Sequence, residues 1–234
     1  MNLLQKKYGI IFFLIITSFL IMQTTLKGEG RIIKEKTFSV NQGETISIEP
    51  SGADVKIKSW DKNEAYVKII GNKRAEDRMN FIIEKSESEI RVIAKRKVSS
   101  FFNFWGSMNL RIEAFVPSSF NVNINTSGGD IDVDDINGKL NLITSGGDIK
   151  LNNLKGELII ETSGGDIELI NISGKLIAKT SGGDIECKNI SGDIDLNTSG
   201  GDMEIYAKEG RINAATSGGD IKISLDKDFK GEAD

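Results

Sequence analysis

Six aspartates with regular spacing are the residues of this sequence that come closest to a repeated chemical site. Each ends a Thr-Ser-Gly-Gly-Asp pentapeptide, and the copies recur every 18 residues: Asp130, Asp148, Asp166, Asp184, Asp202 and Asp220. Carboxylates beside paired glycines could bind calcium, as in nonapeptide β-rolls. That motif needs Gly-Gly-x-Gly-x-Asp in both halves of the coil, whereas here one half has Gly-Gly-Asp and the other a single glycine. We therefore expect each aspartate to accept backbone N–H bonds in its own turn, with a cation site as the alternative.

Groups for catalysis are scarce. The chain has no histidine and one cysteine, Cys187. Without histidine the ordinary pairing of a nucleophile with a base is absent, and the serine of each pentapeptide has no base at a fixed spacing. Cys187 stands where other repeats have Leu, Ile or Val, so we interpret it as a buried apolar residue. We predict that the protein is not an enzyme and has no cofactor.

The elements that position these residues follow from apolar alternation. Each repeat contains two short runs with period two, such as Ile149/Leu151 and Leu158/Ile160. Period two indicates strands with alternate side chains facing inward. A two-strand unit cannot bury its own apolar face, whereas identical coils stacked in register bury a continuous one. We predict an all-β fold, a single-stranded parallel β-solenoid with 18-residue coils over residues 118–225.

One outward position supports this register independently. The residue after the mid-repeat glycine alternates in sign through five repeats: Lys139, Glu157, Lys175, Asp193 and Arg211. Stacked coils place equivalent residues about 4.8 Å apart. Like charges directly opposite each other destabilise a sheet, so alternation favours a parallel stack in register.

The rest of the chain divides into three regions. In residues 1–26, Lys6 and Lys7 precede an uncharged apolar run, which predicts a signal peptide or a hydrophobic helix that anchors the chain and leaves the remainder extracytoplasmic. Residues 30–117 contain further short apolar runs, which predict a β-strand cap for the solenoid. Residues 226–234 break the repeat, and we expect either a short natural end or a truncated one.

Charge excludes one class of partner. Residues 27–117 hold 17 Lys and Arg against 13 Asp and Glu, whereas residues 118–234 hold 11 against 21. An acidic repeat region repels phosphates, so we expect no nucleic acid as a partner.

The repeats resemble a known group of proteins. The Ser-Gly-Gly-Asp-Ile turns, the Asn-Ile-x-Gly spacing and the stretch Ser51-Gly-Ala-Asp-Val-Lys-Ile-Lys-Ser-Trp60-Asp are similar to the bacterial putative-adhesin family of β-strand-repeat domains, a domain of unknown function. The similarity runs from about Ile46 to Ile223. It implies a solenoid displayed at the cell envelope, in some members linked to envelope-stress systems, and it implies no catalytic residues.

One stretch departs from the strand pattern and suggests a membrane contact. Basic and aromatic residues follow one another here: Lys95, Arg96, Lys97, Phe101, Phe102, Phe104 and Trp105. They could form a loop on an anionic membrane. The alternative is a long hairpin connection whose aromatic rings pack on the cap.

A second surface could receive a partner. The alternation that points Leu142, Leu158 and Leu176 inward forces Ile143, Ile159 and Ile177 outward on one face. An apolar patch on a polar wall is covered by something, either the cap folding back or a docking partner. We predict a cell-surface binding or scaffold module, a putative adhesin, whose partner is an envelope or surface molecule or another copy. Envelope-stress sensing is the alternative function.

Overall fold

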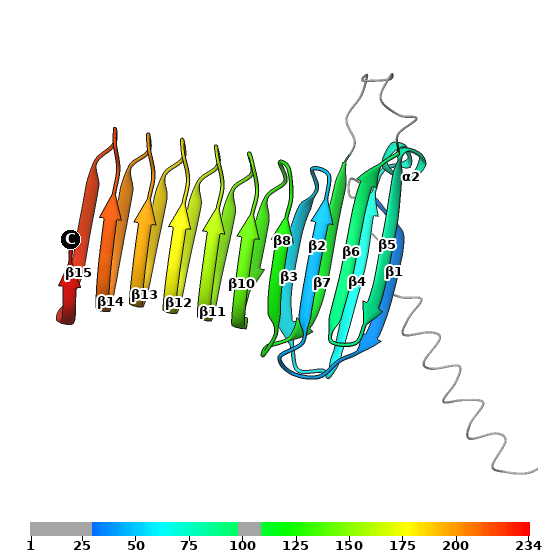
Figure 1. Cartoon of the computed structure of the whole chain (residues 1–234), viewed down its shortest axis with the longest axis horizontal. Coiled ribbons are helices and arrows are strands. Elements are labelled where there is room, and N and C mark those ends of the chain that lie inside the picture. Colours follow the sequence, from blue (N-terminus) through cyan, green and yellow to red (C-terminus); the bar gives the residue numbers. More distant parts are fainter. Residues whose placement is uncertain (1–29, 98–108) are drawn as a thin grey trace, which may run out of the picture.

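The computed structural model describes residues 30–97 and 109–234, and the predicted N-terminal hydrophobic helix and the aromatic residues at 101–105 lie outside them. Strands stack side by side along one axis, from a cap at one end to β15 at the other (Figure 1). The predicted all-β parallel solenoid is confirmed. Among these described residues, no helix is long and apolar enough to cross a membrane.

The cap strands are β1 (Arg31–Ser39), β2 (Thr45–Pro50), β3 (Asp54–Trp60), β4 (Glu64–Gly71), β5 (Met79–Ser86), β6 (Glu89–Arg96) and β7 (Leu110–Pro117), with one short helix, α2 (Lys73–Arg78). The repeats form β8 (Asn121–Asn125), β9 (Ile131–Asp134), β10 (Asn137–Ile143), β11 (Ile149–Glu161), β12 (Ile167–Lys179), β13 (Ile185–Asn197), β14 (Met203–Ala215) and β15 (Ile221–Ala233).

Each coil contributes one segment to each of two opposite walls. We call wall A the sheet of β8, β10 and the C-terminal halves of β11 to β15, of which the segments up to β14 precede the Thr-Ser-Gly-Gly-Asp turns. Wall B is the sheet of β9 and the N-terminal halves of β11 to β15, which follow those turns. Neighbouring coils pair in parallel with an offset of 18 residues, for example Leu158 with Leu176. The predicted register is therefore the observed one.

The core is a continuous stack of aliphatic side chains between the walls. The inward residues of both runs are almost fully buried, as Ile149, Leu151, Leu158 and Ile160 illustrate. Cys187 lies among them and pairs in register with Leu169 and Ile205. Burial raises the pKa of its thiol to about 12, with a smaller contribution from Glu186. The thiol is thus neutral and packed, as its sequence position predicts.

The Thr-Ser-Gly-Gly-Asp turns bond one coil to the next through the threonine. Thr162 is buried, and its hydroxyl donates to the carbonyl oxygen of Gly147 in the preceding coil. The second glycine of each turn passes so close to the preceding coil that a Cβ added to Gly165 would lie 2.0 Å from Gly147 O. Only glycine therefore fits this position.

The opposite turns carry a ladder of asparagine amides. Asn153, Asn171 and Asn189 adopt left-handed backbone angles with φ of 55 to 59°. Their Nδ2 groups donate to the side chain one coil earlier, over 2.9 Å for Asn171 to Asn153. The next equivalent position is Ala207, which cannot continue the ladder, and the pairing of β13 with β14 shifts there.

The cap continues the walls without a break at residue 117. On wall A the strand order runs β10, β8, β2, β6, β5, and on wall B it runs β9, β3, β7, β4, β1. Strands β2 and β3 thus form a coil that stacks directly on β8 and β9, although some 60 residues separate them in sequence. The turn between them, Ser51-Gly-Ala-Asp54, takes the place of a repeat turn, because Asp130 N–H donates to Asp54 Oδ1.

The far end of the cap is closed by lysines and a short helix. Lys34 and Lys36 of β1 donate to the carbonyls of Phe81 and Ile83 on β5, and Lys85 of β5 donates to Ser39 O. These bonds satisfy groups at the edge of a sheet, where an unpaired strand would invite association.

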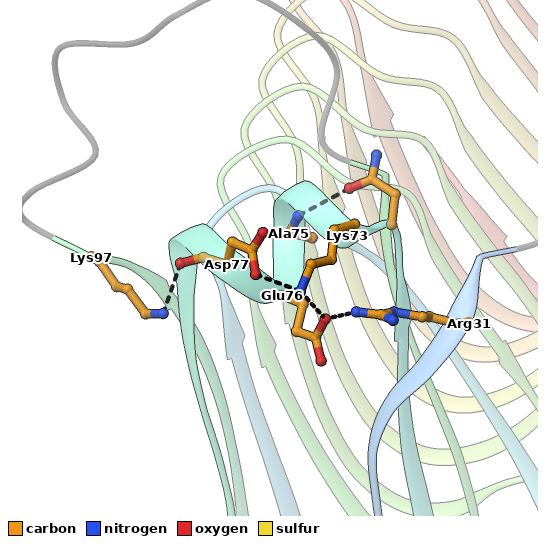
Figure 2. Close-up of polar contacts among 7 residues, drawn as sticks. Arg31, Lys73, Ala75, Glu76, Asp77 and Lys97 are labelled. Atoms are coloured by element: carbon orange, nitrogen blue, oxygen red, sulfur yellow. Dashed lines mark hydrogen bonds and ion pairs between the residues drawn. The ribbon is translucent and has the colours of Figure 1, made fainter.

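Helix α2 was not foreseen from the sequence, and Figure 2 shows the contacts around it. Asn72 caps it by accepting the Ala75 N–H at 2.9 Å. Glu76 forms an ion pair with Arg31 of β1, and Lys97 Nζ donates to Asp77 O at 2.7 Å. The helix therefore joins β1, β5 and the end of β6 at one corner of the cap.

Strand β15 follows the repeat only in its first half. Leu225 pairs with Ala207 at the usual offset, but Lys230 pairs with Glu209, so three additional residues lie in the turn. After this longer turn the strand regains wall A, and Glu232 pairs with Arg211. The segment 226–233 is therefore part of the stack although its sequence departs from the repeat.

Candidate docking surface

Wall A presents three outward columns of side chains, one residue from each coil. The first, which we call the charge column, alternates in sign through its whole length: Lys139, Glu157, Lys175, Asp193, Arg211 and Glu232. Lys139 and Glu157 form an ion pair at 3.1 Å, and Arg211 and Asp193 form one at 2.7 Å. The predicted column is confirmed, and Glu232 extends it beyond the five residues recognised in the sequence.

The other two columns contain the three outward isoleucines. The middle column consists of Asn123, Asn141, Ile159, Ile177, Asp195 and Asn213. The outer column, next to the turns, consists of Asn125, Ile143, Glu161, Lys179, Asn197 and Ala215. Ile159 and Ile177 are direct neighbours, whereas Ile143 lies one coil before Ile159 and one column across. The three form a small apolar patch.

The patch is open to solvent. Ile159 is 44% exposed and Ile143 and Ile177 are half-buried. Shallow grooves flank it on wall A, one lined by Asn123, Asn141 and Ile159 and another by Ile177, Asp195 and Asn213. The described part of the cap stacks on the end of the solenoid rather than over this wall (Figure 1). The described cap strands therefore do not cover the apolar patch.

The aspartate column accepts backbone N–H bonds, but not in its own turns. Each carboxylate accepts the N–H of the aspartate one coil later, with distances of 2.7 to 3.1 Å from Asp54 to Asp202. The expected local bond is replaced because stacking brings the next coil's backbone within reach. Among residues 30–97 and 109–234, no group of three or more His, Cys, Asp and Glu side chains is placed to hold a metal ion.

Two of the three basic residues predicted to contact a membrane have partners within the cap. Lys95 forms an ion pair with Glu49 at 3.1 Å, and Lys97 donates to Asp77 O. Arg96 is exposed on β6 beside Met79 of β5. The aromatic members Phe101, Phe102, Phe104 and Trp105 lie outside the described residues. The structure thus places only the basic half of this candidate.

An aromatic cluster on the outward face of the cap was missed by sequence reasoning. Phe115 of β7 lies between Trp60 of β3 and Tyr66 of β4, with ring centroids 5.6 and 6.4 Å apart. Lys62 Nζ covers the Trp60 ring at 4.5 Å. Burial, followed by the hydrogen bond to Glu35, raises the pKa of Tyr66. Period two within each strand could have identified these residues as outward, but not that the three strands are neighbours.

Coils that pair in parallel from one repeat to the next on both walls define the class of the fold, a β-solenoid. The chain matches the family model described as Toastrack DUF4097 over residues 43–234 and belongs to this family. This match confirms the resemblance seen in the repeats. A search of curated proteins finds no match.

A comparison with solved structures finds several that are similar to this chain. A putative adhesin from Bacteroides fragilis is 11% identical, with a TM-score of 0.40, and the alignment covers 86% of this chain and 96% of that one. A putative lipid binding protein from Parabacteroides distasonis is 16% identical, with a TM-score of 0.41 and coverages of 88% and 97%. A putative cell adhesion protein from Clostridium sporogenes is 9% identical, with a TM-score of 0.39 and coverages of 86% and 99%.

Proposed function

We propose that this protein is a non-catalytic binding or scaffold module that acts outside the cytoplasmic membrane. Its N-terminal segment either anchors it or is removed on export. The solenoid serves as a rigid wall that presents side chains in fixed columns. Wall A is the face that receives the partner.

The apolar patch carries this proposal. Ile159 is among the most exposed large apolar residues of the repeat region, and Ile177 lies beside it. Apart from Ile143 and Ala215, the other residues of the three outward columns are polar or charged. Exposed apolar residues that gather on a polar rim are typical of interaction sites. The solenoid does not need them for its own core, because the inward residues on either side of each are fully buried.

Rigidity supports a scaffold role. Backbone pairing runs from coil to coil on both walls, and the threonine, asparagine and aspartate columns add side-chain bonds at both edges. A preorganised surface loses little conformational entropy on binding. We therefore expect the partner to bind to the outward columns rather than in a cleft.

Location and docking are tested separately in cells that produce the full chain. Protease added to intact spheroplasts should digest the solenoid, because the lysines of the N-terminal segment keep only its start in the cytoplasm. Protection until the membrane is opened would contradict the extracytoplasmic placement.

For docking, the triple variant Ile143→Ser, Ile159→Ser, Ile177→Ser should lose capture of envelope components while keeping its melting temperature. The matched control is Ile170→Ser, which changes a half-buried outward isoleucine on wall B. Equal capture by the wild type and the triple variant would contradict a role for wall A.

A further inference from the structure

The outward columns of wall A are complementary to themselves. Two sheets that pack face to face lie about 10 Å apart. A two-fold axis that lies between them and runs parallel to the strands reverses the order of coils but keeps each column opposite itself. If the axis passes between β11 and β12, each residue of wall A in β11 faces its register partner of β12 in the second copy.

This arrangement matches charge with charge and apolar with apolar. Glu157 then faces Lys175 of the second copy, and Ile159 faces Ile177. In the outer column, Glu161 faces Lys179. By symmetry each of these contacts occurs twice, so four isoleucines meet at the centre with opposite charges on both sides.

The next coils outward fit as well. Lys139 faces Asp193 of the second copy, and Asn141 faces Asp195. In the outer column Ile143 faces Asn197. One coil further, Asn121, which lies 18 residues before Lys139 of the charge column, faces Arg211 of that column. No like charges oppose each other in the three columns between β8 and β14.

Other two-fold arrangements fail on charge. An axis parallel to the stack would place Glu157 opposite Glu161 and Lys175 opposite Lys179 of the second copy. An axis through a strand would place Lys139 opposite Lys175. An axis one gap further along would place Ile177 opposite Asp195. Like-charge contacts and unpaired charges against apolar groups disfavour these alternatives.

We propose that wall A pairs with wall A of a second copy of this chain about the axis between β11 and β12. The proposal rests on the docking role proposed above, because it assigns a partner to the same patch. The contact face has six strands, which lie about 4.8 Å apart and are roughly 17 to 23 Å long, so its area is about 500 to 650 Å² per copy. Interfaces of this size are at the lower limit of stable pairs, so we expect a dimer of about micromolar affinity.

The mass of the full chain in neutral detergent, measured by sedimentation equilibrium from about 1 to 200 μM, tests the proposal. We expect a reversible dimer. Glu161→Lys should weaken it by about tenfold or more, because it places two like-charged pairs at the interface. The double variant Glu161→Lys, Lys179→Glu restores opposite charges and should return the dissociation constant to within about threefold of the wild type.

Two controls separate the interface from other effects. Glu168→Lys makes the same charge change on wall B and should leave the dimer unaffected. Thermal melting of each variant by circular dichroism shows whether the coil remains folded, and the double variant keeps the neighbouring pair of opposite charges within one chain.

A monomer at every concentration overturns the proposal, as does a dimer that Glu161→Lys leaves unchanged or that the double variant fails to restore while melting like the wild type. These failures differ from failure of the docking role. If the chain stays monomeric but the triple isoleucine variant loses envelope capture, the partner is a different molecule and the proposed function stands.

Discussion

The hydroxyl of Thr162 joins two coils, because it donates to Gly147 O at 3.0 Å and accepts from the Gly165 N–H of its own turn at 3.3 Å. Thr144, Thr180 and Thr198 make the same pair of bonds. Equivalent threonine hydroxyls occupy stacked positions in successive coils. Their bonds, however, go to backbone groups. Each threonine thus fixes both the shape of its turn and the position of the preceding coil.

Replacing Thr162 with valine should therefore destabilise the protein more than the small change in side-chain size suggests. The variant keeps the shape but removes both bonds at a buried position, which costs about 1 to 3 kcal/mol. Thr162→Ser keeps the hydroxyl and should cost only the buried methyl group, about 0.8 kcal/mol. Urea unfolding compares the two, and equal losses would mean that the hydroxyl contributes nothing.

The two glycines of one turn should differ sharply in their tolerance of alanine. A Cβ on Gly165 would lie 2.0 Å from Gly147 O, whereas a Cβ on Gly164 meets nothing within 4 Å. We expect Gly165→Ala to cost about 3 kcal/mol or more, because the coils must separate. Gly164→Ala should stay within about 0.5 kcal/mol. A difference of less than about 1 kcal/mol would contradict the observed spacing of coils.

Strict periodicity made the solenoid itself predictable from the sequence. Six identical turns fixed the coil length, and the alternation around each turn separated inward residues such as Leu158 from outward ones such as Ile159. The sign alternation from Lys139 to Arg211 fixed the register. The coil length, the inward or outward direction of each side chain and the register all recur from one repeat to the next, so they can be recognised directly in the sequence.

Features that depend on contacts without a fixed repeat were not predictable. The coil of β2 and β3 stacks on β8 and β9 across a long separation in sequence, and periodicity does not specify such a contact. The bond from each aspartate to the next coil was misplaced because turn propensities describe only local bonds. The column to which each outward isoleucine belongs likewise needed the observed pairing.

The aspartate column should be structural and insensitive to calcium. Asp184 Oδ1 accepts the Asp202 N–H at 2.7 Å, and an asparagine oxygen can accept the same bond. Asp184→Asn should therefore melt close to the wild type, whereas Asp184→Ala should lose about 0.5 to 1.5 kcal/mol. Melting of the wild type should be the same in excess calcium and in chelator. A rise of many degrees with calcium would identify a cation site instead.

The charge column should make a small contribution that depends on salt. Glu157 lies between Lys139 and Lys175, and Glu157→Lys would place three like charges in a row. Because these side chains are exposed, we expect a loss of at most about 1 kcal/mol at low salt, reduced at high salt. Glu157→Gln is the control that removes the attraction without adding repulsion. Identical unfolding midpoints for both variants at low salt would contradict the stacked column.

The buried ion pair of Glu44 with Lys85 should make the cap sensitive to acid. The Glu44 carboxylate lies 2.8 Å from Lys85 Nζ, and its other oxygen accepts from Asn41 N and Nδ2 at 3.1 and 3.0 Å. Burial alone would raise the pKa of Glu44, but the bonds from Lys85 and Asn41 outweigh it and hold the pKa below its usual value. A lowered pKa in the folded state means that the stabilisation is complete above the ordinary glutamate pKa of about 4.3 and is lost as pH falls through the folded value.

Glu44→Gln should cost about 1 to 3 kcal/mol at pH 7, and the difference from the wild type should shrink only at acid pH. Glu49→Gln, which breaks the exposed pair with Lys95, is the matched control and should cost less than about 1 kcal/mol. Urea unfolding from about pH 3 to pH 7 measures both variants, and a Glu44→Gln loss that stays constant down to the lowest pH would exclude this carboxylate as the titrating group.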